Sequence, residues 1–350
     1  MHPLAELWTW FADTSCAGYS PLYERISRAV AASPEMIDLI SEAPPSGHQP
    51  TVLLASVHYL LLDGLDHPLA AVYAGTSDAD PGPLFVDVCL GRRGRVLDLL
   101  ATRHTNTNEV GRSAVLGPAL MTVADELGAP LGLVDVGCSA GLNLLCDRYL
   151  LDYGPAGTTG PHDAAVRISC EVVGGNPPIA SALPAIAARV GIDRDPVDAT
   201  DDDDVRWQLA CVWPDTGRLP RTRLALEAAR RTPVQLVRGD ALESVTDVVV
   251  GLPAGVVPVV MTTWAAAYFS VRERVTFREA LAAASRERPV AWISGEGPGV
   301  IDLFAHVEAP AAAHGLEPSV LGLVVFRDGG HDDRLLAFVH PHGNWIDWRA

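Results

Sequence analysis

A short apolar segment that runs into a turn of small residues is the feature that most constrains the fold of this chain. Residues 131–143 read Leu-Gly-Leu-Val-Asp-Val-Gly-Cys-Ser-Ala-Gly-Leu-Asn. Gly137, Ser139 and Gly141 let the backbone turn tightly from a buried strand into a helix. In such a turn the amide N–H groups and the helix N-terminus can bind a polar ligand. The segment therefore predicts a ligand-binding turn at the end of a buried strand.

From residue 131 onward, segments typical of strands alternate with segments typical of helices. The expected strands are 131–136, 166–173, 188–193, 234–238, 256–262, 290–294, 320–326 and 334–339. The clearest helices between them are 141–150, 221–231 and 271–286. This alternation predicts an α/β fold with a mostly parallel sheet and helices on both of its faces.

The first third of the chain carries apolar side chains at helical spacing instead. The pattern is clearest at residues 4–12, 21–32 and 51–62. We therefore expect an all-helical N-terminal domain of residues 1–125 that caps the strand ends. An α/β domain of residues 126–350 follows it.

The net charge and the types of basic residue limit the kinds of molecule that the chain is expected to bind. The formal net charge is −17, and no long basic run is present, so we expect no binding to nucleic acid or to an anionic membrane. All 26 basic residues are arginine. The absence of lysine excludes Schiff-base chemistry and the lysine of a phosphate-binding P-loop. A small molecule or a peptide is the expected substrate.

The cysteines, the N-terminus and one uncharged stretch indicate the cellular compartment of the protein. Six scattered cysteines form no C-x-x-C pair, which favours buried thiols over a zinc site or disulfides. The N-terminus lacks the pattern of a signal peptide. The uncharged stretch 248–271 is interrupted by glycine and proline, which favours one buried strand over a membrane span. These patterns predict a cytoplasmic protein.

Acidic and small residues follow several of the expected strands. Because ligands bind beyond the carboxyl ends of parallel strands, these residues are the candidate site. Asp193 ends the strand 188–193, and its carboxylate is suited to accept both hydroxyls of a ribose. The other strand ends carry Asp135 with the Gly137–Gly141 turn, Asp240 with Ala241, and Thr263 with Trp264.

This arrangement resembles the Rossmann-like S-adenosylmethionine-dependent methyltransferases. In that superfamily a D-x-G-x-G-x-G loop lies under the methionine part of the cofactor, one acid binds the ribose and a later Asp meets the adenine. The resemblance implies that S-adenosylmethionine is the cofactor and that its binding residues are Asp135, Gly137, Ser139, Gly141, Asn143, Asp193, Asp240, Ala241, Thr263 and Trp264. Ser139 replaces the usual middle glycine. Glu171 is an alternative to Asp193, which follows the loop by about fifty residues rather than about twenty.

A second resemblance covers nearly the whole chain. The chain is similar to a bacterial family catalogued as a domain of unknown function, which implies that the helical region and the sheet belong together but implies no activity. The residues that carry this resemblance are 20–24, His58, 105–112, 136–144, 147–149, 191–193 and 212–215.

Polar residues of the helical region are candidates for the acceptor side of the reaction. If 103–112 is helical, Thr105, Asn108, Glu109 and Arg112 share one face. Glu109 could then accept a proton, and Arg103 or Arg112 could bind a carboxylate. A network between the domains is the alternative. His58 and Tyr268 are further catalytic candidates, with core packing as the alternative for both.

The same turn also fits a different enzyme class. Residues 137–141 match G-x-S-x-G, the strand–turn–helix elbow that exposes the nucleophile of α/β-hydrolases. Acids and His331, His340 and His342 follow, in the order serine, acid, histidine that this fold requires. Against a Ser139 esterase, that elbow follows earlier strands that supply part of the oxyanion hole, whereas here the preceding chain is mostly helical. A non-catalytic nucleotide-binding protein is a further alternative.

Overall fold

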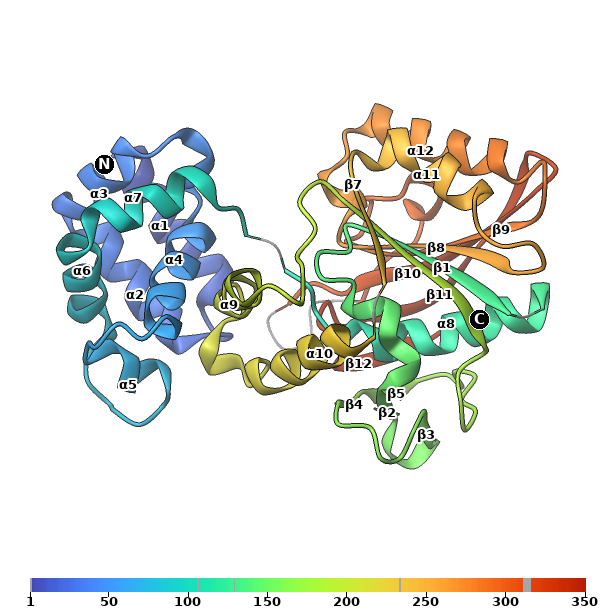
Figure 1. Cartoon of the computed structure of the whole chain (residues 1–350), viewed down its shortest axis with the longest axis horizontal. Coiled ribbons are helices and arrows are strands. Elements are labelled where there is room, and N and C mark those ends of the chain that lie inside the picture. The colour runs from blue at the N-terminus through green and yellow to red at the C-terminus, as the bar shows by residue number, and fades with distance from the viewer. Residues whose placement is uncertain (1, 106, 129, 233, 311–315) are drawn as a thin grey trace. The chain divides into compact units, whose positions relative to one another are not determined.

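The computed structural model describes residues 2–105, 107–128, 130–232, 234–310 and 316–350. The chain forms two compact units (Figure 1). Unit 1 consists of Met1–Thr107 and Thr200–Arg223, and unit 2 of Asn108–Ala199 and Leu224–Ala350. This division differs from a single boundary at residue 125, because a later piece of the chain belongs to unit 1.

Unit 1 is helical, as its N-terminal part was expected to be. Proline stands in the first turn of α1, α2, α3, α4 and α6, where its missing N–H costs no hydrogen bond. The helices are α1 (Pro3–Phe11), α2 (Pro21–Ala32), α3 (Pro34–Glu42), α4 (Pro50–Leu62), α5 (Leu69–Tyr73), α6 (Pro81–Gly91), α7 (Arg93–Thr102) and α9 (Asp202–Ala210). A π-helix (Ala12–Cys16) extends α1, and α10 (Leu219–Arg231) begins in this unit and ends in unit 2.

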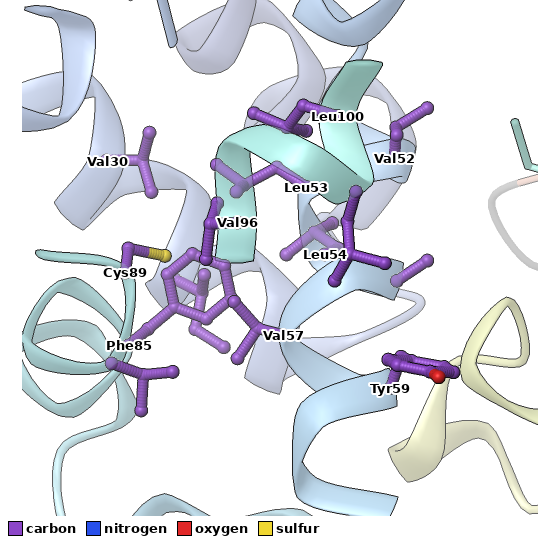
Figure 2. Packing of buried hydrophobic residues seen from close by; sticks show 14 of the residues in the cluster. Val30, Val52, Leu53, Leu54, Val57, Tyr59, Phe85, Cys89, Val96 and Leu100 are labelled. Carbon is purple, nitrogen blue, oxygen red and sulfur yellow. The ribbon is translucent and has the colours of Figure 1, made fainter. Parts of the chain in front are cut away.

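Helix α4 lies at the centre of unit 1. It is buried on nearly all sides, as expected of a helix that is apolar all round. Figure 2 shows Val57 and its neighbours on α4 beside Phe85 of α6 and Val96 of α7. Trp207 of α9 belongs to the same core, although it lies far along the chain. The core of unit 1 is therefore completed only by residues from the second half of the sequence.

Unit 2 contains a sheet of nine strands in the order β5-β12-β11-β10-β9-β8-β1-β6-β7. Strands β7, β6, β1, β8 and β9 are parallel, β10 and β11 form an antiparallel hairpin, and β12 is antiparallel to β11 and parallel to β5. The sheet is thus mixed, with a parallel centre. Its strands are β1 (Leu131–Val136), β5 (Glu171–Gly174), β6 (Ile186–Asp193), β7 (Gln235–Arg238), β8 (Val257–Thr263), β9 (Val290–Glu296), β10 (Ser319–Arg327), β11 (Gly330–Val339) and β12 (Trp345–Trp348).

The expected strand 166–173 is divided between two sheets. Its first part is β4 (Arg167–Ser169), which pairs with β2 (Leu150–Asp152), itself paired with β3 (Thr158–Thr159). Its second part is β5, at the edge of the large sheet. The prediction of one strand here was wrong, because the chain changes partners at Cys170.

Helices cover both faces of the large sheet (Figure 1). On one face, α11 (Ala241–Val250) and α12 (Val271–Ala284) bury Val249 and Phe277 against strand residues such as Val134 and Trp292. On the other face, α8 (Arg112–Leu127) contacts β9. A 3₁₀ segment, Leu142–Arg148, stands where the helix 141–150 was expected. Among the described residues, no helix is long and apolar enough to cross a membrane.

Two further expectations about local structure have clear outcomes. Arg103–Thr105 and Thr107–Gly111 are not helical, and α8 begins only at Arg112, so the predicted shared helical face does not form. Residue 106 lies outside the described residues. All six cysteines are buried and free, as expected.

Candidate functional site

The carboxyl ends of the parallel strands lie at one edge of the sheet in unit 2. The Gly137 turn follows β1, Asp193 ends β6 and Asp240 follows β7. Thr263 ends β8, and Glu296 ends β9. Such an edge is the usual ligand site of an open α/β sheet, so we take these residues as the candidate site.

The turn after β1 is held in an uncommon backbone conformation. Gly137, Ser139 and Gly141 have φ angles of 73°, 51° and 70°, in the left-handed region that favours glycine. A Cβ atom on Gly137 would lie 2.9 Å from the Cβ atom of Ala265. Glycine is therefore required at position 137 by both conformation and space.

Ser139 adopts the left-handed conformation without being glycine, so its surroundings must stabilise it. Its N–H donates a hydrogen bond of 2.8 Å to Oδ2 of Asp193. Its carbonyl accepts a bond of 3.2 Å from the N–H of Val197. The turn after β1 is thereby fixed to the end of β6.

Asp193 links three strand ends. Its Oδ1 accepts a hydrogen bond of 2.9 Å from the N–H of Asp195, and its carbonyl accepts one of 2.9 Å from the N–H of Gly239 after β7. The side chain is half-buried. Glu171, the alternative acid, is on β5 at the opposite end of the sheet. The structure thus brings Asp193, and not Glu171, to the turn after β1.

Asp240 caps the start of α11. Its Oδ1 accepts a hydrogen bond of 2.8 Å from the N–H of Leu242, and its Oδ2 accepts one of 2.6 Å from Nη2 of Arg194. Burial raises the pKa of this carboxyl, but the bonds from Arg194 and Leu242 outweigh it, so the pKa is lowered. Ala241, the first residue of α11, is half-buried beside it.

Asp135 is the least compensated acid of the site. It is 2% exposed, and its Oδ2 has no hydrogen-bond partner among the described residues. Its pKa is raised to about 7, chiefly by burial; the charge of Arg112 opposes the rise, and the charge of Asp193 adds to it. A buried carboxylate oxygen without a partner is costly, and such groups are common where a ligand supplies the missing charge.

Two residues that were expected to act on the acceptor form hydrogen bonds with backbone groups. Glu109 is 5% exposed and accepts a hydrogen bond of 2.8 Å from the N–H of Gly111. Arg112 donates to the carbonyls of Thr263, at 2.8 Å, and Pro341, at 3.0 Å. Arg112 therefore joins the start of α8 to the end of β8 and to the loop after β11.

The segment before α8 and the first turn of α8 also support the turn after β1. Asn108 accepts a hydrogen bond of 2.8 Å from the N–H of Leu142. Ser113 donates one of 3.0 Å to Oδ1 of Asn143, which is 1% exposed. Asn143 is therefore a buried support of the turn.

The remaining catalytic candidates lie in other surroundings. His58 is on α4 in unit 1, 3% exposed, with Nδ1 at 3.1 Å from the carbonyl oxygen of Ala210. Burial lowers its pKa to about 4, so it is neutral near pH 7. These surroundings fit the core-packing alternative that was considered for His58. Tyr268, beyond the end of β8, is 88% exposed.

The serine-hydrolase alternative depends on Ser139. A positive φ fits the strained turn of a nucleophile elbow, but that elbow exposes its serine, whereas Ser139 is fully buried. His331 is exposed at the start of β11. His340 is buried after β11, and its Nδ1 accepts a hydrogen bond of 3.0 Å from the N–H of His342.

Glu296 was missed by the sequence reasoning. It ends β9, is 1% exposed and accepts hydrogen bonds from the N–H groups of Ala265, Ala266 and Ala267. The signal was present, because an acid follows the apolar strand 290–294 by two residues, as acids end other strands of the sheet. The described residues contain no group of three or more side chains that could hold a metal ion.

A family model described as "Uncharacterized protein conserved in bacteria" matches residues 5–348. The chain belongs to this family, DUF2332. Because the match runs through both units, it confirms that the helical region and the sheet belong together, as the sequence resemblance implied. No curated protein and no solved structure matches the chain.

Proposed function

We propose that this protein binds S-adenosylmethionine and transfers its methyl group to a small molecule or a peptide. The observation that carries the proposal is the hydrogen bond between the Ser139 N–H and the Asp193 carboxylate, which joins a glycine turn to a strand-end acid. We interpret unit 2 as Rossmann-like, because β7-β6-β1-β8-β9 follows the order third, second, first, fourth and fifth along the chain.

The residues of the site suit the three parts of this cofactor. The buried Oδ2 of Asp135 has no hydrogen-bond partner within the described part of the chain, and the ammonium group of a methionine moiety would supply one. Gly137 leaves the turn without a side chain. Each oxygen of Asp193 accepts one amide N–H, which leaves lone pairs for two ribose hydroxyls. We assign Asp240 to accept a hydrogen bond from the adenine amino group.

When bound, the cofactor supplies a methyl group on a reactive sulfonium, so the protein has to bind, orient and shield the reactants. Glu109 accepts the N–H of Gly111 just before α8, and Arg112 joins the start of α8 to the end of β8 through the carbonyl of Thr263. We therefore assign them to positioning rather than to proton transfer. Thr263 and Trp264 extend from β8 toward the same edge.

Calorimetric titration with S-adenosylhomocysteine and S-adenosylmethionine tests the proposal, with NAD as a control ligand. The wild-type chain is expected to bind both compounds and not NAD. Asp193→Ala should weaken binding at least tenfold, or about 1.4 kcal/mol, because the hydroxyls lose their acceptor. Glu171→Ala, an acid at the far edge of the sheet, is the matched control and should bind as the wild type does.

Failure of the wild-type chain to bind either compound at millimolar concentration would overturn the proposal. Labelling of Ser139 by a serine-reactive phosphonate would then favour the hydrolase. Thermal unfolding of both variants separates lost binding from lost folding.

A further inference from the structure

The chain that follows β8 is strained where it enters the candidate site. Trp264 has a φ angle of 58°, and a bulky residue rarely adopts this conformation. Its N–H donates a hydrogen bond of 3.0 Å to the carbonyl of Gly295, and its indole N–H donates one of 2.9 Å to Oγ of Ser319. Such a conformation persists only where the surrounding structure holds it in place.

Glu296 holds the three residues that follow Trp264. Its Oε1 accepts hydrogen bonds from the N–H groups of Ala265, at 3.1 Å, and Ala266, at 3.0 Å. Its Oε2 accepts one of 3.2 Å from the N–H of Ala267. Three successive amides thus converge on one carboxylate, in the manner of an anion-binding nest.

Arg274 of α12 holds the same segment from its carbonyl side. Its Nε donates to the carbonyl of Ala266 at 3.0 Å, and its Nη2 to that of Ala267 at 3.4 Å. Its Nη1 donates to the carbonyl of Val300 at 2.8 Å. We name residues 264–267 the tryptophan loop. Glu296 binds the amides of Ala265, Ala266 and Ala267, and Arg274 binds the carbonyls of Ala266 and Ala267.

The tryptophan loop borders the turn that we assign to the cofactor. The Cβ atom of Ala265 lies 2.9 Å from the position that a Cβ atom on Gly137 would take. At Gly297, just after β9, a Cβ atom would contact the Trp264 indole at 3.7 Å. The loop is thus packed between the Gly137 turn and the end of β9.

We propose that Glu296 is a positioning residue that holds the tryptophan loop against the Gly137 turn and so shapes the wall of the ligand site. This inference rests on the proposed cofactor function. A buried acid is a costly way to fix a loop, and its pKa is raised by burial while the three amides and Arg112 oppose the rise. A neutral glutamine at this position would turn its amide hydrogens toward one of the three N–H donors.

Glu296→Gln is the main test, with Glu273→Gln as the matched control. Glu273 also accepts a backbone N–H, that of Ser270, but it caps α12 outside the tryptophan loop. We expect Glu296→Gln to weaken S-adenosylhomocysteine binding at least tenfold. Glu273→Gln should leave the affinity unchanged.

A second measurement reports on the tryptophan loop in the absence of ligand. The fluorescence of Trp264, taken as the difference between each chain and its Trp264→Phe counterpart, should change in Glu296→Gln and not in Glu273→Gln. If Glu296→Gln fails to fold, Arg274→Gln loosens the same loop through its carbonyls and should change affinity and fluorescence in the same direction.

Folded variants of Glu296 and Arg274 that bind as the wild type does, even with a lowered unfolding temperature, would overturn the inference. A wild-type chain that binds neither cofactor compound would overturn the proposed function instead. In that case an unchanged Trp264 signal in Glu296→Gln would overturn the positioning of the loop as well, and a changed signal would support it.

Discussion

At the scale of single residues, Asp135 makes folding stability depend on pH. Its pKa in the folded protein is about 7, against an ordinary value of 3.8, because burial disfavours the charged form. The folded state therefore binds a proton more tightly than the unfolded state does. The protein is stabilised by this group below about pH 4, and that contribution is lost as the pH rises toward 7.

Asp135→Asn removes the titration and keeps the shape of the side chain. The variant should gain stability over the wild type, and the gain should be about 2–3 kcal/mol larger at pH 8 than at pH 5. Chemical denaturation at the two pH values measures the difference, with the exposed Asp98→Asn as control. The same variant should bind S-adenosylhomocysteine more weakly. A gain that is equal at both pH values would contradict the raised pKa.

At the scale of elements, the need for glycine in the turn after β1 can be tested by comparison with a glycine elsewhere in the chain. Gly137 and Gly255 both have positive φ angles, of 73° and 80°, but a Cβ atom on Gly255 would meet nothing within 4 Å. Gly255→Ala should cost about 1–2 kcal/mol for the left-handed conformation alone. Gly137→Ala should cost more, because its Cβ atom also meets Ala265.

Urea unfolding measures the stability of each glycine variant. Titration with S-adenosylhomocysteine then compares the affinities of the two variants. Only Gly137→Ala should lose affinity, since only that glycine lies in the turn of the site. Equal costs for the two variants would show that the contact with Ala265 relaxes without strain.

Sequence reasoning located the elements whose burial is visible in one short segment. Strands β1, β8 and β9 are buried on both faces and show as apolar runs, so they were confirmed. The same reasoning did not find α8, which contains Pro118, or the short strand β12, which pairs with β5 and β11. The shared face that a helix over 103–112 would give does not form, because Asn108 and Arg112 bind backbone groups of distant segments.

The candidate site could be predicted from the sequence to about the same extent as the fold. The rule that ligands meet the carboxyl ends of strands led to Asp135, Asp193 and Asp240. The bond between Ser139 and Asp193 joins positions 54 apart and has no signature in the sequence. Glu296 followed the same rule but went unnoticed, because its partners are backbone amides.

At the scale of the whole molecule, the two units are interleaved along the chain. Unit 1 needs α9, since Trp207, Ala210 and Cys211 are part of its core. The carbonyl of Ala210 also contacts His58, and Asp203 accepts the hydroxyl of Tyr59. A boundary at residue 125 therefore separates α9 from the helices that it packs against.

Two fragments test this interleaving. Residues 1–125 alone should lack cooperative unfolding, because burial of Trp207 contributes about 2–3 kcal/mol that the fragment loses. Residues 1–107 joined by a glycine–serine linker to residues 200–223 should regain it. Circular dichroism during urea unfolding measures both. Cooperative unfolding of 1–125 with undiminished stability would show that α9 adds nothing to the core.

The interleaving also sets the order in which the chain can fold as it leaves the ribosome. About 90 residues separate the first part of unit 1 from its second. At typical rates of synthesis, about 5–20 s pass before α9 follows the first seven helices out of the exit tunnel. During this interval the surface of α4 that receives Trp207 is uncovered. Slow codons between positions 107 and 223 should lengthen that exposure and lower the yield of native protein.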